Sequence, residues 1–151
     1  MLTHVRSATL AAVAGLETAH LDYRPDAHAN SIGALLLHIA AAEAGYQVVT
    51  FENRSPNAED LEPWGPALEL GDRARREIRG ADLGFYLDRL SAVRERTLTE
   101  LRQRQDAWLA ERTPFKDASI DNYYKWFHVF THEVNHRGQI RWLRVRALHA
   151  S

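Results

Sequence analysis

The stretch DNYYKWFHVFTHEVNHRGQIRWLRVRAL, residues 121–148, decides the fold of this chain. It contains no proline and is long enough for about eight helical turns. Asp121, or alternatively Ser119, can accept a hydrogen bond from the first free amides of a helix. The stretch therefore predicts one long helix that begins at one of these two residues and ends near Leu148.

Three further segments have apolar residues at helical spacing. One covers roughly residues 2–20. Another covers roughly residues 31–53, with Asn30 or Ser31 as its cap. A third begins after Asp82 and carries an apolar face made of Leu83, Leu87, Leu90, Val93, Thr97 and Leu101.

The connection between the second and third segments is long. Residues 54–80 contain three prolines, and we expect a crossover with a helical turn at residues 72–78. A crossover of this length allows the two helices that it joins to run parallel. No alternating strand pattern of useful length is present, and Thr113-Pro114 ends the last connection. The prediction is an all-α, four-helix bundle forming one domain over residues 1–151.

Composition excludes several classes of protein. Hydrophobic residues make up 45% of the 151 residues and charged residues 26%, as in ordinary globular proteins. The 19 basic and 20 acidic residues give a net charge of -1, so we expect no nucleic-acid partner. The chain has no cysteine, which excludes disulfides, cysteine-ligated metals and a thiol nucleophile of its own.

The apolar runs do not predict a membrane segment. The longest, Ile32 to Ala42, is shorter than a spanning helix needs and is interrupted by His38. Ala8 to Leu16 follows Arg6 as in a signal peptide, but no cleavage site follows and residues 17–20 continue a helix. We expect a cytoplasmic protein with no membrane contact.

Histidines are the chemically informative residues. His128, His132 and His136 recur every fourth residue, so a helix places them within an arc of about 80°. Two histidines at this spacing can bind one metal ion with ring nitrogens about 2 Å from it. His38 lies in an apolar part of the second helix, where it needs a partner. If the second and fourth helices are neighbours, His38 supplies a third ligand.

A structural alternative stands beside this interpretation. A single buried histidine is more often a satisfied core residue than a ligand, and the spacing alone leaves the two alternatives equal. Small residues around His38 leave space for an open site, or else permit tight packing. These residues are Ala34, Ala41, Ala42 and Gly45. Gly138 destabilises the middle of a helix by about 1 kcal/mol, which predicts a close helix contact there.

The segment from His132 to His136 also matches the H-E-x-x-H pattern of zinc peptidases, in which the glutamate is the general base. Here no acidic residue follows Glu133 to complete the ligand set, and only His149 remains beyond the motif. We therefore do not expect a peptidase. Glu133 lies about 100° from His132 on the helix and is expected at the surface or beside a ligand.

Two stretches together resemble the DinB/YfiT-like family. Asn30-Ser31-Ile32-Gly33, leading into Leu36-Leu37-His38-Ile39-Ala40 and followed by Ala42-Glu43, resembles the family's first signature. The second signature resembles residues 128–140, HVFTHEVNHRGQI. The order of the helices and the long middle connection also fit, so the resemblance covers the whole chain.

The resemblance implies an up-down-down-up bundle that binds a divalent metal, most often zinc or nickel, through three histidines. By position these are His38, His132 and His136. The wider family includes S-transferases and isomerases that use bacillithiol or mycothiol. The resemblance thus implies that a metal activates a low-molecular-weight thiol, which attacks an electrophilic substrate. Hydrolysis by metal-bound water, or a non-catalytic binding protein stabilised by metal, remain alternatives.

Several neighbours are candidates for supporting roles. His128 is a candidate fourth ligand or proton shuttle, although we favour a residue beside the ligands. Gln139 and Lys125 flank the same helix face and would orient the substrate or serve the structure. Tyr46 and Glu52 are weaker candidates. Arg137 points away and is expected to pair with an acid on another helix.

The opposite side of the last helix is also apolar, with Tyr123, Phe127, Phe130 and Val134. A helix that is apolar on two sides must bury both. We therefore expect a homodimer through this face, unless the third helix or the crossover covers it.

Overall fold

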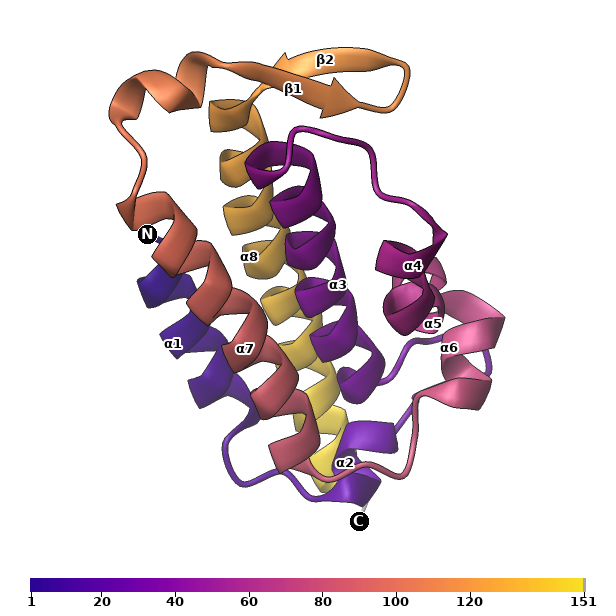
Figure 1. The fold of residues 1–151 in the computed structure, drawn as a ribbon. Coiled ribbons are helices and arrows are strands. Elements are labelled where there is room, and N and C mark those ends of the chain that lie inside the picture. The colour runs from indigo at the N-terminus through magenta and orange to yellow at the C-terminus, as the bar shows by residue number, and fades with distance from the viewer. Residues whose placement is uncertain (151) are drawn as a thin grey trace.

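The computed structural model describes residues 1–150 and is built on four long helices (Figure 1). They are α1 (Leu2–Val13), α3 (Ile32–Phe51), α7 (Leu83–Arg102) and α8 (Asn122–His149). The prediction of an all-α bundle is confirmed, with one small hairpin added.

The three longest helices begin where the sequence supplies a side-chain cap. In each, an oxygen of the cap accepts a hydrogen bond from the amide three residues further on, which satisfies a free helix donor. The caps are Ser31 for α3, Asp82 for α7 and Asp121 for α8. Two residues had been considered as the cap of each of two helices. The cap of α3 is Ser31 and not Asn30, and the cap of α8 is Asp121 and not Ser119.

The prediction of a first helix over residues 2–20 is wrong at its end. α1 ends at Val13, and Gly15 adopts a left-handed conformation with φ of +75°. This conformation suits glycine and turns the chain. A separate short helix, α2 (Thr18–Asp22), then leads toward α3.

The crossover contains more helix than the one turn predicted. It is made of α4 (Ala58–Leu61), a 3₁₀ turn η1 (Glu62–Trp64), α5 (Gly65–Glu69) and α6 (Gly71–Glu77). These short helices lie along the outer side of α3 (Figure 1). The crossover therefore supplies a wall of the site described below.

The connection between α7 and α8 contains a hairpin that the sequence analysis missed. A 3₁₀ turn, η2 (Asp106–Ala110), is followed by β1 (Arg112–Phe115) and β2 (Ala118–Asp121), which pair antiparallel. The strands have only four residues each. A segment this short gives too few alternations of polar and apolar residues to be recognised.

The four long helices run in two pairs. In Figure 1, α3 and α7 rise together, whereas α1 and α8 descend. Side-chain contacts agree: Gly33 of α3 packs on Tyr86 near the start of α7, and Gln47 further along α3 donates a hydrogen bond to the carbonyl of Val93. A Cβ atom at position 33 would lie 2.5 Å from the Tyr86 hydroxyl. Glycine is thus required for this parallel pair to approach.

Four buried charges join the long helices at the middle of the bundle, one from each helix. We call this group the charge quartet: Arg6, Glu43, Arg94 and Glu133. Arg6 Nε lies 2.9 Å from Glu133 Oε1 and its Nη2 lies 3.0 Å from Glu43 Oε2. Arg94 makes 2.7 Å ion pairs with both glutamates. Each arginine also donates to a backbone carbonyl, of Leu90 and Leu2 respectively.

Among the described residues, α3 is the one helix long and apolar enough to cross a membrane by length and composition. No membrane segment was expected from the sequence, because His38 interrupts the longest apolar run. In the fold, 61% of that apolar window is buried inside the bundle. α3 therefore has the burial of a core helix.

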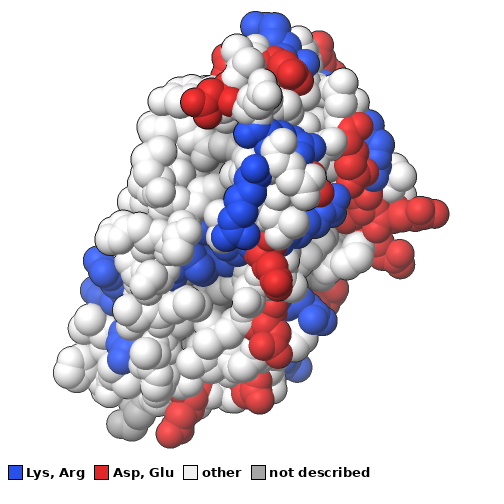
Figure 2. Space-filling model, turned by 60° about the vertical axis from the view of Figure 1, so that its left-hand side comes forward, with Lys and Arg blue, Asp and Glu red and all other residues white. Residues whose placement is uncertain are grey.

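Charges on the face shown in Figure 2 are mixed. Basic and acidic side chains lie side by side there, and an area at the upper left carries neither. This face does not present a field of one sign.

Candidate metal centre

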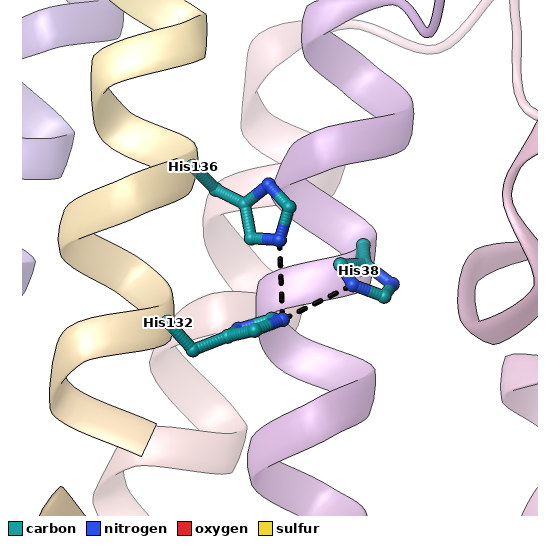
Figure 3. Close-up of side chains that lie close together, drawn as sticks. All are labelled: His38, His132 and His136. Carbon is teal, nitrogen blue, oxygen red and sulfur yellow. Dashed lines mark hydrogen bonds between the residues drawn. The ribbon is translucent and has the colours of Figure 1, made fainter. Parts of the chain in front are cut away.

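Three imidazoles converge between α3 and α8 (Figure 3). His38 comes from α3, and His132 and His136 come from successive turns of α8. The Nε2 atom of His132 lies 3.1 Å from Nε2 of His38 and 3.1 Å from Nε2 of His136. One ring nitrogen from each residue lies within 4.8 Å of the others. We call this group the histidine cluster.

The crossover fixes the orientation of His38. Its Nδ1 atom lies 2.7 Å from the carbonyl oxygen of Ala67 in α5. Because a carbonyl oxygen only accepts, Nδ1 must carry the proton. The neutral ring then has its lone pair on Nε2, which faces His132.

Gln139 fixes His136 in the same way. Nδ1 of His136 lies 2.8 Å from the amide oxygen of Gln139, one turn further along α8. This oxygen is also an acceptor, so Nδ1 donates and the lone pair of His136 lies on Nε2. Gln139, predicted beside the site, is thus in contact with one of its residues.

The three Nε2 atoms therefore hold at most one proton among them while the rings are neutral. His132 Nε2 can donate to one neighbour, but the other then faces it with no hydrogen between the two nitrogens. Converging lone pairs of this kind repel one another in the absence of a positive charge. The arrangement is compatible with binding of a metal cation.

Burial keeps the rings neutral. Burial is the largest cause, and together with the neighbouring charges of His136 and His38 it lowers the pKa of His132 to about 3. Burial also lowers the pKa of His38, although the hydrogen bond to Ala67 opposes this shift. For His136, burial again lowers the pKa against the effect of Gln139. At neutral pH the cluster therefore presents uncharged imidazoles, the form that binds metals.

His128 lies beside the cluster and is not among the three that converge. Its ring centre is 5.7 Å from that of His132 and 5.7 Å from that of Tyr46. The ring of Tyr124 stacks on it at 6.4 Å. Burial raises the pKa of Tyr46 to about 12, so this hydroxyl keeps its proton. His128 and Tyr46 thus continue the row of polar rings from His132.

Lys125 does not flank the histidines as a free cation. It is fully buried, and its Nζ donates to the carbonyls of Thr113 and Ile120 at 2.8 and 2.7 Å and to the Thr113 hydroxyl. These partners belong to the hairpin, which the sequence analysis did not foresee. Of the two roles considered for Lys125, the structural one describes these contacts.

Glu133 was predicted at the surface or beside a ligand, but the structure places it in neither position. Its side chain is fully buried and belongs to the charge quartet, where it pairs with Arg6 and Arg94. Burial alone would raise the pKa of Glu133, but the hydrogen bond and charge of Arg6 and the charge of Arg94 hold it below its ordinary value. The carboxylate is thus held in ion pairs with Arg6 and Arg94, which contradicts the role of general base in the H-E-x-x-H pattern.

Other candidates are placed as follows. Ala34 and Ala41 are buried in the core, in agreement with tight packing. A Cβ atom at Gly138 would meet nothing within 4 Å, so the predicted close helix contact is absent. Glu52 pairs with Arg54 and Arg96.

Arg137 has no ion pair with any residue in the described part of the chain, contrary to expectation. Sequence reasoning also missed the Ala67 carbonyl. No side chain marks a backbone acceptor, so only the folded crossover shows it.

The fold and the site define a class of protein: a four-helix bundle whose core helix and last helix bring three imidazoles together. The chain belongs to the DinB superfamily, whose sequence profile matches residues 1–140. This agrees with the resemblance inferred from the two signatures.

Solved structures with the same fold include a crystal structure of a conserved protein from Enterococcus faecalis, with a TM-score of 0.74 and 18% sequence identity. The match covers 99% of this chain and 94% of that one. No curated protein matches the sequence.

Proposed function

We propose that the protein binds a divalent metal ion through Nε2 of His38, His132 and His136. The observation that carries the proposal is the convergence of three Nε2 atoms with at most one proton among them. Two nitrogens bound to one tetrahedral ion lie about 3.3 Å apart. The two separations of 3.1 Å are close to this value.

The donor set indicates the class of metal. Neutral imidazoles suit zinc, nickel and related transition metals, whereas calcium and magnesium prefer oxygen ligands. Zinc or nickel is therefore the ion we propose. Three protein ligands leave at least one coordination position open, which is typical of catalytic sites and not of structural ones.

We further propose that the site transfers a low-molecular-weight thiol to an electrophile. A bound divalent ion supplies the positive charge that lowers the pKa of a coordinated thiol. In the overall reaction a sulfur–carbon bond forms, the bond from that carbon to its leaving group breaks, and the leaving group departs with the electron pair. The proton of the thiol passes to the leaving group or to solvent. Family membership and the absence of cysteine in the chain support an external thiol.

Neighbouring residues have distinct tasks in this proposal. The Ala67 carbonyl and Gln139 hold His38 and His136 with Nε2 facing inward, as outer hydrogen bonds commonly do for metal-binding histidines. His128 lies one turn from His132 and is the nearest further imidazole able to receive the thiol proton. Its partly buried position between Tyr46 and Tyr124 keeps it close to the cluster.

Two other functions use the same site. If metal-bound water takes the place of the thiol, the reaction is hydrolysis of the electrophile. If no reaction occurs at the metal, the ion serves only to stabilise the fold. The open coordination position favours a reaction, and the family relationship favours the thiol.

Elemental analysis of tag-free protein tests metal binding. We expect about one equivalent of zinc or nickel in the wild type and its loss in His38→Ala, His132→Ala and His136→Ala. His149→Ala is the matched control, because that histidine is exposed at the far end of α8. Wild-type protein that remains metal-free after incubation with either ion contradicts the proposal.

The reaction is tested with the metal-loaded protein and a panel of thiols and electrophiles. We expect consumption of thiol that stops when a chelator removes the metal. Product formation that continues without thiol identifies the hydrolase instead. Stoichiometric metal without turnover of any pair in the panel favours the non-catalytic alternative.

We also propose a homodimer through the apolar face of α8. Tyr123 and Phe127 are 61% and 47% exposed, and their rings stack. Phe130 is half-buried and lines a hollow of about 320 Å³ with Leu98 of α7. Light scattering should give twice the chain mass, and Phe127→Glu should give the monomer mass; a monomeric wild type contradicts this.

A further inference from the structure

A hollow lies beside the histidine cluster, between the start of α3 and the second half of α8. Its volume is about 590 Å³, which is within the range of small-molecule sites. It is open on one side. The residues that line it are Ala29, Asn30, Leu35, Asn135, Gly138, Gln139, Trp142 and Leu143.

This hollow adjoins the histidine cluster through Gln139. Gln139 lines it and at the same time bonds His136. Leu35 precedes His38 by about one turn of α3. A molecule in the hollow would therefore lie against the residue that orients His136.

The lining is uncharged although 26% of the chain is charged. Three carboxamides supply its polarity. The oxygen of Asn30 accepts from the Gly71 amide and that of Gln139 from His136, which leaves the NH₂ group of each with no acceptor among the described residues. Such groups favour a ligand that brings neutral oxygen acceptors.

The remaining walls are apolar. Leu35 and Leu143 are buried and form the floor, whereas the Trp142 side chain is 49% exposed. A guanidinium, that of Arg146, lies 3.5 Å from the centre of the indole. A flat or apolar group can pack on this surface beside the carboxamides.

Packing does not explain the glycine at position 138. Glycine destabilises the interior of a helix relative to alanine. Gly33 has a reason in the Tyr86 ring, but an added Cβ at position 138 would meet no atom within 4 Å. It would instead occupy the hollow.

We propose that this hollow binds the uncharged part of the substrate. Its ligand is a neutral molecule with carbonyl or hydroxyl oxygens on one side and a flat apolar group on the other, and Gly138 provides the room for it. The identification of this ligand as substrate rests on the proposed function, but the binding itself does not require the metal.

The test uses N-acetyl-L-phenylalaninamide, a neutral diamide with an aromatic ring and no thiol. Its binding is followed by amide chemical-shift changes in isotope-labelled, chelator-treated protein. We expect shifts at the hollow, and binding weakened at least about tenfold by Gly138→Leu and less by Gly138→Ala. N-acetyl-L-phenylalanine, which carries a carboxylate, should bind more weakly than the diamide.

Gly45→Ala is the matched control. Gly45 also lies inside a long helix and its added Cβ would also meet nothing within 4 Å, but it does not line this hollow. Both alanine variants should melt at a higher temperature than the wild type, and only Gly138→Ala should bind the probe more weakly. Unchanged binding in both Gly138 variants, shifts elsewhere on the surface, no binding, or equal binding of the carboxylate overturns the proposal.

A parallel titration with zinc separates the two proposals. If the protein binds the probe but not zinc, the proposal for the hollow is supported and the proposed metal site is refuted. If the protein binds zinc but not the probe, the metal site is supported and the proposal for the hollow is refuted.

Discussion

The histidine cluster and the charge quartet lie in the same bundle and are joined by one peptide bond, because His132 belongs to one and Glu133 to the other. They differ in how their polar atoms are satisfied. Every nitrogen and oxygen of the four quartet side chains has a partner, and two positive charges meet two negative ones. The cluster has three nitrogens that face one another with at most one proton. A satisfied buried group holds the fold together, whereas converging unsatisfied atoms indicate a missing ligand.

The largest effect is expected for Glu133→Gln, which changes the charge quartet. The substitution keeps the shape but leaves Arg6 and Arg94 with one carboxylate between two buried guanidinium groups. Removal of one partner from a buried ion pair costs about 3–5 kcal/mol. We expect a fall of this size in the free energy of unfolding, measured by urea denaturation of metal-free protein.

Acid should remove the same contribution. The pKa of Glu133 is lowered in the fold from its ordinary value of 4.5. Its stabilisation is therefore fully present above pH 4.5 and is lost as the pH falls toward the lowered folded pKa. The difference in stability between wild type and Glu133→Gln should shrink over this interval. A difference that is small at pH 7, or constant with pH, contradicts the role given to the quartet.

The second prediction concerns the neighbouring residue. His132→Leu removes an unsatisfied imidazole from a mostly buried position, so metal-free stability should stay the same or rise. Zinc at a hundredfold excess over its dissociation constant stabilises a protein by about 2.7 kcal/mol. We expect this gain in the wild type and none in the variant, measured as denaturation with and without zinc.

The comparison of His132→Leu with Glu133→Gln is the sharpest one available, because the residues are adjacent. If His132→Leu destabilises the metal-free protein as strongly as Glu133→Gln, the cluster is a structural element of the core.

The third prediction tests a smaller effect on the cluster. Gln139→Leu removes the acceptor that orients His136, and loss of such a contact commonly weakens metal binding about 10- to 100-fold. Gln139→Glu keeps an acceptor oxygen and should retain most of the affinity. Competition with a chromophoric chelator measures both. Equal affinity in wild type and Gln139→Leu shows that His136 needs no orienting partner.

The spacing of apolar residues predicted the four long helices, because each helix has an apolar face and three of them begin at recognisable caps. His132 and His136 could be predicted to lie together because residues four apart share a helix face. Spacing alone placed His38 beside them only on the condition that α3 and α8 are neighbours, and the three-histidine set came from the family resemblance. Short-range conformational detail was harder. Gly15 ends α1 in the middle of an apolar pattern that continues to Leu16, so spacing alone overextends the helix.

Partnerships between distant residues could not be predicted. Glu133 is separated by 127 positions from Arg6, and its helical angle gave no indication that three other helices supply charges there. The Ala67 carbonyl is a main-chain group and has no sequence signal at all. Such contacts depend on tertiary packing, which one sequence without its fold does not reveal.

The smallest expected effect concerns Lys125, which shares the helix face of the cluster but is satisfied like the quartet. Lys125→Met fits the same space and removes the bonds that hold the hairpin to α8. Loss of these bonds is offset in part because a buried charge is also removed, and we expect a destabilisation of about 1–2 kcal/mol. Zinc affinity should be unchanged, because the amine makes its contacts with Thr113 and Ile120 and not with the histidines. Weaker zinc binding by a fully folded Lys125→Met variant would instead show that Lys125 contributes to the metal centre. The distinction between satisfied and unsatisfied polar groups would then fail at this residue.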